Sequence, residues 1–307
     1  MLTCDAYHRP RSLADALALW GAAPEGSRLV SGATDLYPAA RDGRAGDVHL
    51  PALIDLSAVP ELGGYEIAKG RVHLGAGTVY QDFLTDPVLR QNLPCMPHVA
   101  IWFADDQIRE VATLAGNLVN ASPVADGTPA AVALNGAIEL ARLEQGGIRR
   151  RTVELESFIQ GPGRTVIEPG EIATRVSLDS CCGYGGAFQK VGQRRSLVIS
   201  VACCAALVRT DAEGRIFEDV RLALGGVGPG PIRLREAERL LRGNRIDTET
   251  ILRAADGAAE HVASRSRRDY RREVVANFVR AALEEALDAR PNRAPSHDQT
   301  KETMANA

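Results

Sequence analysis

Two stretches of small and polar residues hold the side chains best suited to bind a phosphate. The first is made up of Leu29, Val30, Ser31, Gly32, Ala33, Thr34, Asp35 and Leu36. Glycine lets an anion approach the backbone N–H groups closely, and the hydroxyl groups of Ser31 and Thr34 can donate further hydrogen bonds. A turn after a strand favours the same residue types for structural reasons, so this stretch by itself favours the structural interpretation.

The second stretch covers residues 113–126 and carries a wider set of polar groups. Its members of interest are Thr113, Ala115, Gly116, Asn117, Ser122 and Asp126. The glycine permits close approach, the asparagine amide donates and accepts, and the carboxylate of Asp126 can hold a ribose diol. Alone, this stretch could also be a capped turn. A dinucleotide needs phosphate contacts from more than one segment, so the two stretches together favour a dinucleotide site.

The cysteines do not form a metal-binding pattern. They are Cys4, Cys95, Cys181, Cys182, Cys203 and Cys204, with no Cys-x-x-Cys spacing. Adjacent cysteines in a strand point to opposite faces, so the two neighbouring pairs are poorly placed to hold one metal. We therefore expect no metal site on this chain, and we expect both pairs to be small buried side chains. The six histidines receive no assignment.

Composition excludes several classes of protein. The chain has 307 residues, about two domains' worth, and 45% of them are hydrophobic. Its 36 basic and 39 acidic residues give a net charge of 36 − 39 = −3, so no positive field favours nucleic acid. No apolar run is long enough for a membrane span, and the first residues do not resemble a signal peptide. We expect a cytoplasmic protein.

Periodicity and turn residues predict the elements around the first stretch. A helix is expected from Ser12 to Gly21, with its apolar face formed by Leu13, Ala16, Leu17 and Trp20. Residues 28–30 predict a short strand that leads into the first stretch, and residues 53–56 predict another. Residues 65–74 predict a hairpin that turns at Lys69-Gly70. Between residues 79 and 108, three prolines divide a helical pattern into short helices.

The second half of the chain shows a change of pattern. A short helix and a strand are expected within residues 129–140, a returning strand at 148–155 and another strand at 172–178. After the glycine-rich residues 179–186 come two long apolar strands, 197–208 and 220–227, and then three helices, the last at 269–289. We therefore expect domains at residues 1–180 and 185–290 and a disordered tail at residues 291–307.

Three motifs in this order resemble those of a known family. They are Ser-Gly-Ala-Thr-Asp-Leu at residues 31–36, Gln-Ile-Arg at 107–109 with the stretch 113–126, and Ala-Phe-Gln-Lys-Val-Gly-Gln-Arg-Arg at 187–195. The chain resembles, over nearly its whole length, the FAD-binding medium subunit of molybdenum hydroxylases such as xanthine dehydrogenase and carbon monoxide dehydrogenase. The resemblance implies an α+β fold: a two-subdomain FAD-binding domain of the vanillyl-alcohol oxidase type, followed by a smaller C-terminal domain of antiparallel sheet and helices.

The resemblance also implies roles for particular residues toward FAD. Residues 29–36 match the loop that wraps the pyrophosphate, and residues 113–117 match the second loop, which crosses the phosphates and the ribitol. Asp126 matches an acidic residue that engages the adenosine part, and Lys190 matches a lysine that approaches the flavin. Phe103 matches a position beside the cofactor, and Ile172 lies near one that offers backbone contacts to the adenine end. Ser122 completes the expected set.

Two positions depart from the family pattern, because Ala33 and Ala115 stand where paired glycines are usual. Alanine is tolerated if the backbone angle φ is negative. If either position requires a positive φ, the loop is strained or displaced, which would weaken FAD binding.

The resemblance implies an FAD-dependent electron-transfer subunit of a molybdopterin-containing dehydrogenase. Its implied partners are a large subunit with the molybdenum cofactor and a small iron–sulfur subunit, as a dimer of heterotrimers, with NAD, a quinone or oxygen as electron acceptor. The redox chemistry belongs to the flavin, so we expect no catalytic side chain here. Two alternatives remain at this point: a self-sufficient flavin oxidase or dehydrogenase, and a non-catalytic assembly subunit that has lost FAD.

Overall fold

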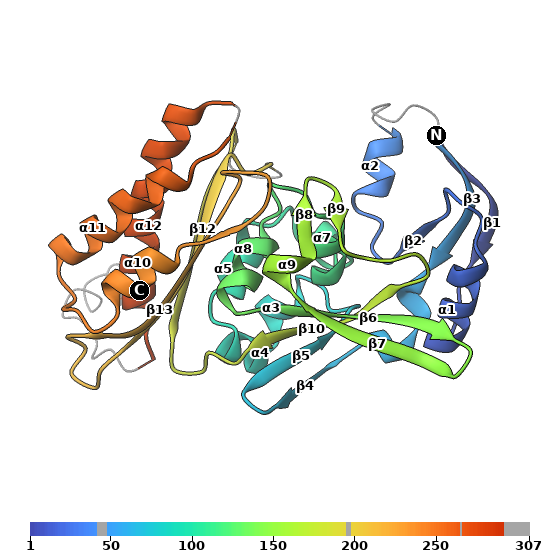
Figure 1. Cartoon of the computed structure of the whole chain (residues 1–307), viewed down its shortest axis with the longest axis horizontal. Helices are drawn as coiled ribbons and strands as arrows, with labels where there is room; N and C mark the ends of the chain where they lie inside the picture. The colour runs from blue at the N-terminus through green and yellow to red at the C-terminus, as the bar shows by residue number, and fades with distance from the viewer. Residues whose placement is uncertain (42–47, 195–197, 265, 292–307) are drawn as a thin grey trace, which may run out of the picture.

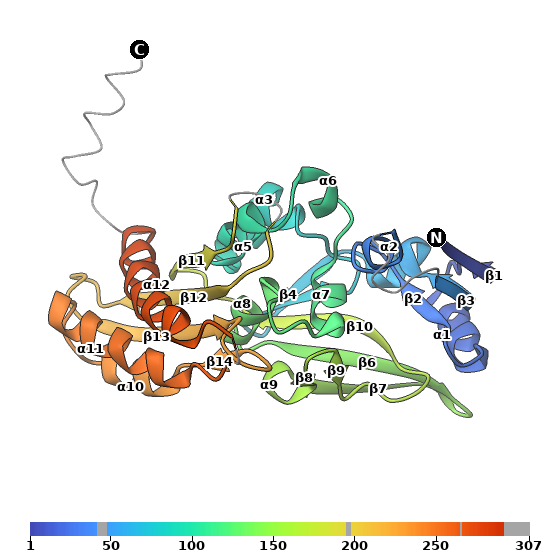
Figure 2. The ribbon, with the colours of Figure 1, turned by 90° about the horizontal axis from the view of Figure 1, so that it is seen from above.

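The chain folds into three sheet-based units arranged in a row (Figures 1 and 2). The computed structural model describes residues 1–41, 48–194, 198–264 and 266–291. Within them, helices and sheets are mixed, as the predicted α+β class requires. None of the helices in these ranges is long and apolar enough to span a membrane.

The first unit is a three-stranded parallel sheet in the order β1-β3-β2. Its elements are β1 (Leu2–His8), α1 (Leu13–Ala22), β2 (Arg28–Val30), α2 (Leu36–Arg41) and β3 (Val48–Asp55). The carboxyl ends of parallel strands meet at one edge, so the chain leaves β2 and β3 on the same side. There, the first small-residue stretch follows β2, and the short 3-10 helices η1 (Leu56–Ala58) and η2 (Pro60–Leu62) follow β3.

The second unit is a five-stranded antiparallel sheet in the order β4-β5-β10-β6-β7. Its strands are β4 (Tyr65–Ala68), β5 (Arg71–Gly75), β6 (Ala137–Glu144), β7 (Gly147–Glu154) and β10 (Ile172–Asp179). The two tight hairpins have their turns at Lys69-Gly70 and at Gln145-Gly146, where positive φ angles at Lys69, Gly70 and Gly147 suit the turn.

Short helices surround this middle sheet. They are α3 (Asp82–Thr85), α4 (Pro87–Asn92), α5 (Met96–Trp102), α6 (Asp106–Arg109), α7 (Leu114–Asn120), α8 (Gly127–Ala133) and α9 (Leu155–Phe158), followed by the small ladder of β8 (Ile159–Gly161) and β9 (Arg164–Thr165). Proline stands at the start of α4 and near the start of α5, where its missing N–H costs nothing. The predicted division into short helices is confirmed.

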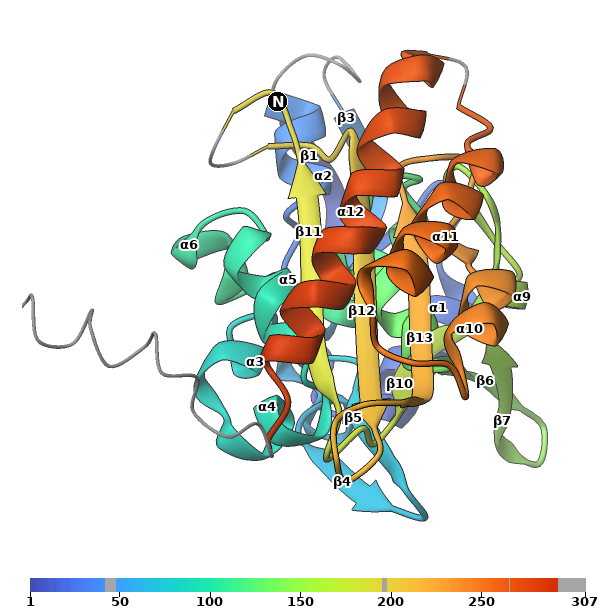
Figure 3. The same cartoon turned by 90° about the vertical axis from the view of Figure 1, so that its left-hand side faces the viewer.

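The third unit is an antiparallel sheet in the order β11-β12-β13-β14, with helices on one face (Figure 3). Its elements are β11 (Gly185–Val191), β12 (Ala202–Thr210), β13 (Phe217–Gly225), β14 (Ile232–Arg233), α10 (Arg235–Leu241), α11 (Thr248–Ala258), η3 (Ala259–His261) and α12 (Arg268–Asp288). Successive side chains of β12 point to opposite faces of the sheet, so the strand contributes to two cores. Cys203 packs in the core of the middle unit, and Cys204 packs in the core under α12.

Several predicted details are wrong. Strand β1 was not predicted, and Gly21 does not end α1, which continues to Ala22. Residues 198–201 lie outside β12, which begins at Ala202, and Leu197 falls outside the described residues. Cys182 is exposed rather than buried, whereas Cys181 is buried as expected. Of the predicted disordered tail, residues 292–307 lie outside the part of the chain that the structure describes.

Candidate cofactor site

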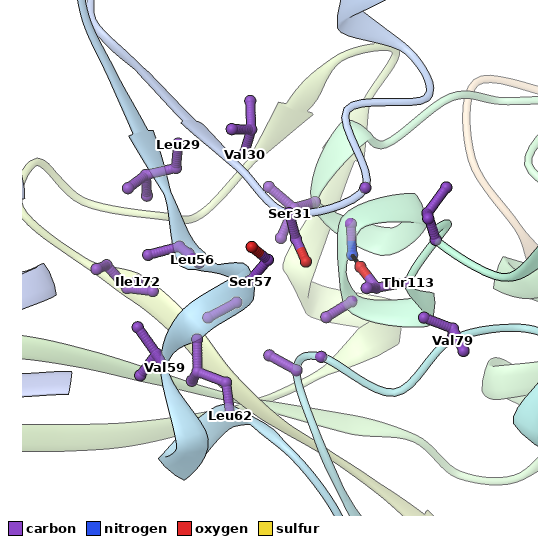
Figure 4. A pocket seen from close by; sticks show the side chains of 18 of the residues that line it. Leu29, Val30, Ser31, Leu56, Ser57, Val59, Leu62, Val79, Thr113 and Ile172 are labelled. Atoms are coloured by element: carbon purple, nitrogen blue, oxygen red, sulfur yellow. Dashed lines mark hydrogen bonds between the residues drawn. The ribbon is translucent and has the colours of Figure 1, made fainter. Parts of the chain in front are cut away.

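A cavity of about 550 Å³ lies where the first unit meets the middle unit. This volume is in the range of small-molecule sites. Its walls come from β2 and the stretch after it, from η1 and η2, from α7 and from β10. In Figure 4 the hydroxyl-bearing Ser31, Ser57 and Thr113 are drawn between the apolar Val79 on one side and the apolar Leu56, Val59 and Ile172 on the other. The cavity therefore has a part bordered by hydroxyl groups and an apolar end at Leu56 and Ile172.

Eight of the predicted cofactor-binding residues line this cavity. They are Leu29, Val30, Ser31, Gly32, Thr113, Ala115, Gly116 and Ile172. These residues come from three separate parts of the chain: the two small-residue stretches and the start of β10. The structure thus brings Ile172, which was predicted only from the family resemblance, next to both stretches. Ala33, Thr34, Asp35, Leu36, Phe103, Asn117, Ser122, Asp126 and Lys190 lie outside the lining.

The first small-residue stretch lies against the residues just before the second stretch, and the contact is at Gly32. A Cβ atom placed on Gly32 would lie 2.0 Å from the carbonyl oxygen of Val111 and 2.6 Å from its carbonyl carbon. No side chain fits in that space, because backbone atoms cannot move aside as a flexible side chain can. Glycine at position 32 thus sets the separation between the first stretch and the residues that lead into the second.

The two alanines that replace family glycines occupy different backbone conformations. Ala33 has a φ of 55°, in the left-handed region that disfavours a Cβ atom by about 1–2 kcal/mol. Ala115 lies inside α7 and is not among the residues with positive φ. Its helix is capped by the preceding Thr113, whose Oγ1 accepts a hydrogen bond from the Gly116 N–H at 3.0 Å. The departure at Ala33 is therefore strained, and the departure at Ala115 is not.

Asp126 and Lys190 form a buried ion pair outside the cavity. The Lys190 Nζ atom lies 2.5 Å from Asp126 Oδ2, and the Ser200 hydroxyl donates to Asp126 Oδ1 at 2.5 Å. Lys190 Nζ also donates to the carbonyl oxygen of Trp102 at 3.1 Å. Burial raises the pKa of the Asp126 carboxyl, and Lys190 and Ser200 oppose that rise. We call Asp126, Lys190 and Ser200 the buried ionic network.

This contact bears on two expected roles. The family resemblance implies that Asp126 engages the adenosine part of FAD and that Lys190 approaches the flavin, at opposite ends of a long molecule. In this structure the two side chains contact each other directly.

Phe103 and Asn117 are linked through a residue that the sequence analysis did not single out. The rings of Phe103 and Tyr80 stack with centroids 3.7 Å apart and planes at 7°, and the Tyr80 hydroxyl donates to Asn117 Oδ1 at 2.9 Å. Tyr80 is completely buried, and burial raises the pKa of its phenol well above the ordinary value. In this structure Phe103 and Asn117 thus both contact the buried Tyr80, and neither lines the cavity.

The remaining predicted cofactor-binding residues come directly after Ala33 or after α7 in the sequence. Leu36 is the first residue of α2, and burial raises the pKa of Asp35. Ser122 lies in the turn between α7 and α8, where its hydroxyl accepts from the Val124 N–H at 3.4 Å. Sequence reasoning also missed cavity residues, among them Trp20 and Glu171. Trp20 carried only an apolar-face signal, and Glu171 carried none.

The residues of the cavity fit a dinucleotide cofactor. The glycine contact at position 32 brings backbone close to the cavity, hydroxyl groups border its middle part, and apolar side chains border the end at Leu56 and Ile172. Phosphates need the first two features and flat aromatic rings need the third. The fold and the site thus define a protein that binds a dinucleotide between a small parallel α/β unit and an antiparallel sheet.

Comparison with known proteins gives the family. Residues 3–179 match the family described as the FAD binding domain in molybdopterin dehydrogenase, and residues 187–286 match the CO dehydrogenase flavoprotein C-terminal domain. The chain is 30% identical over 287 residues to the carbon monoxide dehydrogenase medium chain of Hydrogenophaga pseudoflava, covering 91% of this chain and 96% of that one. It is 28% identical over 290 residues to the xanthine dehydrogenase FAD-binding subunit of Escherichia coli, with 92% and 96% covered.

A solved structure agrees with these relatives. The fold matches a chain of the carbon monoxide dehydrogenase from Hydrogenophaga pseudoflava that lacks the Mo-pyranopterin moiety of its cofactor, with a TM-score of 0.83, 27% identity, and 93% of this chain and 98% of that one covered. This chain belongs to the family of FAD-binding medium subunits of molybdenum hydroxylases. Its cofactor is FAD, and it is the FAD-containing part of an oxidoreductase, as the sequence resemblance predicted.

Proposed function

We propose that this chain is the electron-transfer subunit of a complex with two partners, a large molybdenum-cofactor subunit and a small iron–sulfur subunit. Electrons would pass from the small subunit's clusters through the FAD held here to an external acceptor, which is NAD, a quinone or oxygen. Relatives named as a medium chain and as an FAD-binding subunit support this assignment. A dimer of heterotrimers is the proposed assembly, with residues 1–180 and 185–290 as the two domains of this subunit.

The observation that carries the proposal is the contact of Gly32 with Val111, just before the second small-residue stretch, beside a cavity with a hydroxyl-bearing part and an apolar end. When bound, FAD supplies the ability to take up and release electrons. The chain's own residues bind and orient it. Ser31 and Thr113 offer hydroxyl donors in the middle part of the cavity, while Ile172 and Val59 exclude water at its apolar end.

We place the phosphates beside the hydroxyl-bearing part of the cavity and the adenine at the end formed by Ile172. Lys190 keeps its proposed place near the flavin. Asp126 is moved to that same end, because it contacts Lys190 directly. No side chain of this subunit is proposed as catalytic, and substrate hydroxylation is assigned to the large subunit.

The first test is the absorbance spectrum of the purified chain after incubation with FAD and desalting. We expect retained flavin peaks near one FAD per chain, which bleach on addition of dithionite. For the electron route, the complex assembled with its partner subunits is compared with and without FAD. The FAD-free complex should still show substrate-dependent bleaching of its iron–sulfur clusters, but it should fail to reduce the acceptor.

One observation favours a second candidate, an assembly subunit that has lost FAD. Ala33 holds a positive φ that glycine would hold without strain, in a stretch that borders the cavity. The same experiment separates the two candidates. If neither the natural chain nor the Ala33→Gly variant retains FAD, even with the partner subunits present, the electron-transfer proposal is overturned and the assembly role is favoured.

A further inference from the structure

One of the chain's two tryptophans lines the cavity and is tied in place there. Trp20 lies near the end of α1, partly buried against the core, and borders the cavity. Its indole Nε1 donates to the backbone carbonyl oxygen of Glu171 at 3.0 Å, on the segment that leads into β10. The hydrogen bond joins residues 151 positions apart in the sequence. It therefore fixes the ring between the first unit and the middle sheet.

The residue that receives this hydrogen bond is itself held firmly. The Glu171 carboxylate takes two hydrogen bonds from Arg151, at 2.6 and 2.7 Å, and one from the Glu168 N–H at 2.8 Å. Burial disfavours the charged carboxylate, but these hydrogen bonds outweigh it and hold the pKa of Glu171 below its ordinary value. A bidentate arginine–carboxylate pair fixes both groups in one geometry. Trp20 is thus held at the cavity wall by a prearranged support.

The chemistry of this wall suits a flat, uncharged ring. The only polar atom of the indole is engaged by Glu171, so the ring presents π and hydrocarbon surface to the cavity. Ile172 and Ala173, which follow directly after Glu171, add apolar lining, and the charge of the neighbouring Glu171 is engaged by Arg151. Stacking on an aromatic side chain recognises a nucleobase by its face, without requiring hydrogen bonds to its edge.

FAD has two flat ring systems, and the surroundings of Trp20 favour the smaller one. The proposed function places the adenine at the Ile172 end of the cavity and the flavin near Lys190. Trp20 shares the cavity with Ile172, whereas Lys190 lies outside the lining. An indole at this end would meet the adenine.

We propose that Trp20 stacks on the adenine ring of the cofactor and so gives the subunit its preference for FAD over FMN, which lacks the adenine. This inference rests on the proposed placement of the adenine in the cavity. Trp20 acts as a specificity-determining contact, and Glu171 and Arg151 act as positioning residues that hold it.

The test uses the FAD-free chain with a Trp102→Phe substitution, so that Trp20 is the only tryptophan. Adding ADP should quench the remaining fluorescence, because the base stacks on the indole. Calorimetric titration, which needs no tryptophan, should show that Trp20→Leu weakens FAD and ADP binding by about tenfold or more and leaves FMN binding within twofold, in the range expected for loss of one stacked base. Trp20→Phe should recover most of the FAD affinity, since the aromatic face remains.

FMN binding also shows whether the Trp20→Leu variant is folded, because a misfolded variant would lose both FMN and FAD binding. If the Trp20→Leu variant is misfolded, the Trp20→Phe variant provides the test. An aromatic contact with the base requires its ADP affinity to lie within threefold of that of the natural chain. Equal FAD affinity in the natural chain and the Trp20→Leu variant would overturn the proposal, as would a well-folded variant that loses FMN as strongly as FAD. Failure of the natural chain to bind FAD at all would instead count against the proposed function.

Discussion

The cavity and the buried ionic network are built from different materials. The cavity is formed mainly by small and apolar residues, and its shape depends on the contact of Gly32 with Val111. The network is formed by opposite charges, with the Lys190 side chain 1% exposed and Asp126 9% exposed. The cavity should therefore be sensitive to added atoms, whereas the network should be sensitive to the loss of a partner. The residues predicted to bind FAD thus fall into two groups, one that must stay small and one that must keep its paired charges.

The largest effect should come from removing one charge of the network. Lys190→Met would leave the Asp126 carboxylate buried without its cation, which destabilises proteins by about 3–5 kcal/mol. Denaturant unfolding of the FAD-free chain measures this loss. Lys69→Met is the matched control, because Lys69 is exposed in a hairpin turn and its removal should change stability by less than about 0.5 kcal/mol.

The pH dependence of the Lys190→Met variant gives a second check. Without its cation, the Asp126 carboxyl should have an even higher pKa in the folded state than burial already gives it. A raised folded pKa means that stability is greatest below the unfolded value of about 3.9 and is lost as the pH rises toward the folded value. The deficit should be smaller at pH 5 than at pH 8. The ion-pair account would be contradicted if the loss of stability in Lys190→Met did not vary with pH, or if it were no larger than the loss in the Lys69→Met control.

An intermediate effect should come from adding one carbon atom to the cavity contact. Gly32→Ala places a Cβ atom 2.0 Å from the Val111 oxygen, so the first stretch and the backbone at Val111 must move apart. We expect a loss of about 1–3 kcal/mol in stability and weaker FAD retention after desalting. The control is Gly21→Ala in α1, where the new Cβ atom meets nothing within 4 Å and should stabilise the helix by about 0.5–1 kcal/mol. A Gly32→Ala variant as stable as the natural chain would contradict the close contact.

Elements made by neighbouring residues could be predicted from the sequence. Both hairpins of the middle sheet follow from turn residues, and α1 follows from its apolar face and the Ser12 cap. Strand β1 could not be found in this way. It pairs in parallel with β3, whose partners lie about 46 positions later, as Leu2 with Val48, and no turn residue between them signals that pairing.

The candidate site shows the same limit. The two small-residue stretches could be located because glycine, serine and threonine lie together in the sequence. Trp20 could not be assigned to the cavity, since its place depends on a hydrogen bond to Glu171 far along the chain. The contact between Asp126 and Lys190 was missed for the same reason, being a link across 64 positions. Such contacts are decided by how the units pack and not by local patterns.

The smallest effect, and the finest test of the comparison, comes from restoring glycine at the two alanine positions. Ala33→Gly should raise stability by about 0.5–1 kcal/mol, because Ala33 has a positive φ that glycine adopts without strain. Ala115→Gly should lower it by a similar amount, since Ala115 lies inside α7, where glycine is unfavourable. Thermal or denaturant unfolding of the FAD-free variants measures both changes, and FAD titration shows whether relieving Ala33 also tightens binding. If both substitutions changed the stability in the same direction, backbone conformation would not explain the effect of glycine at these positions. Side-chain contacts would then have to explain it, as they do in the buried ionic network.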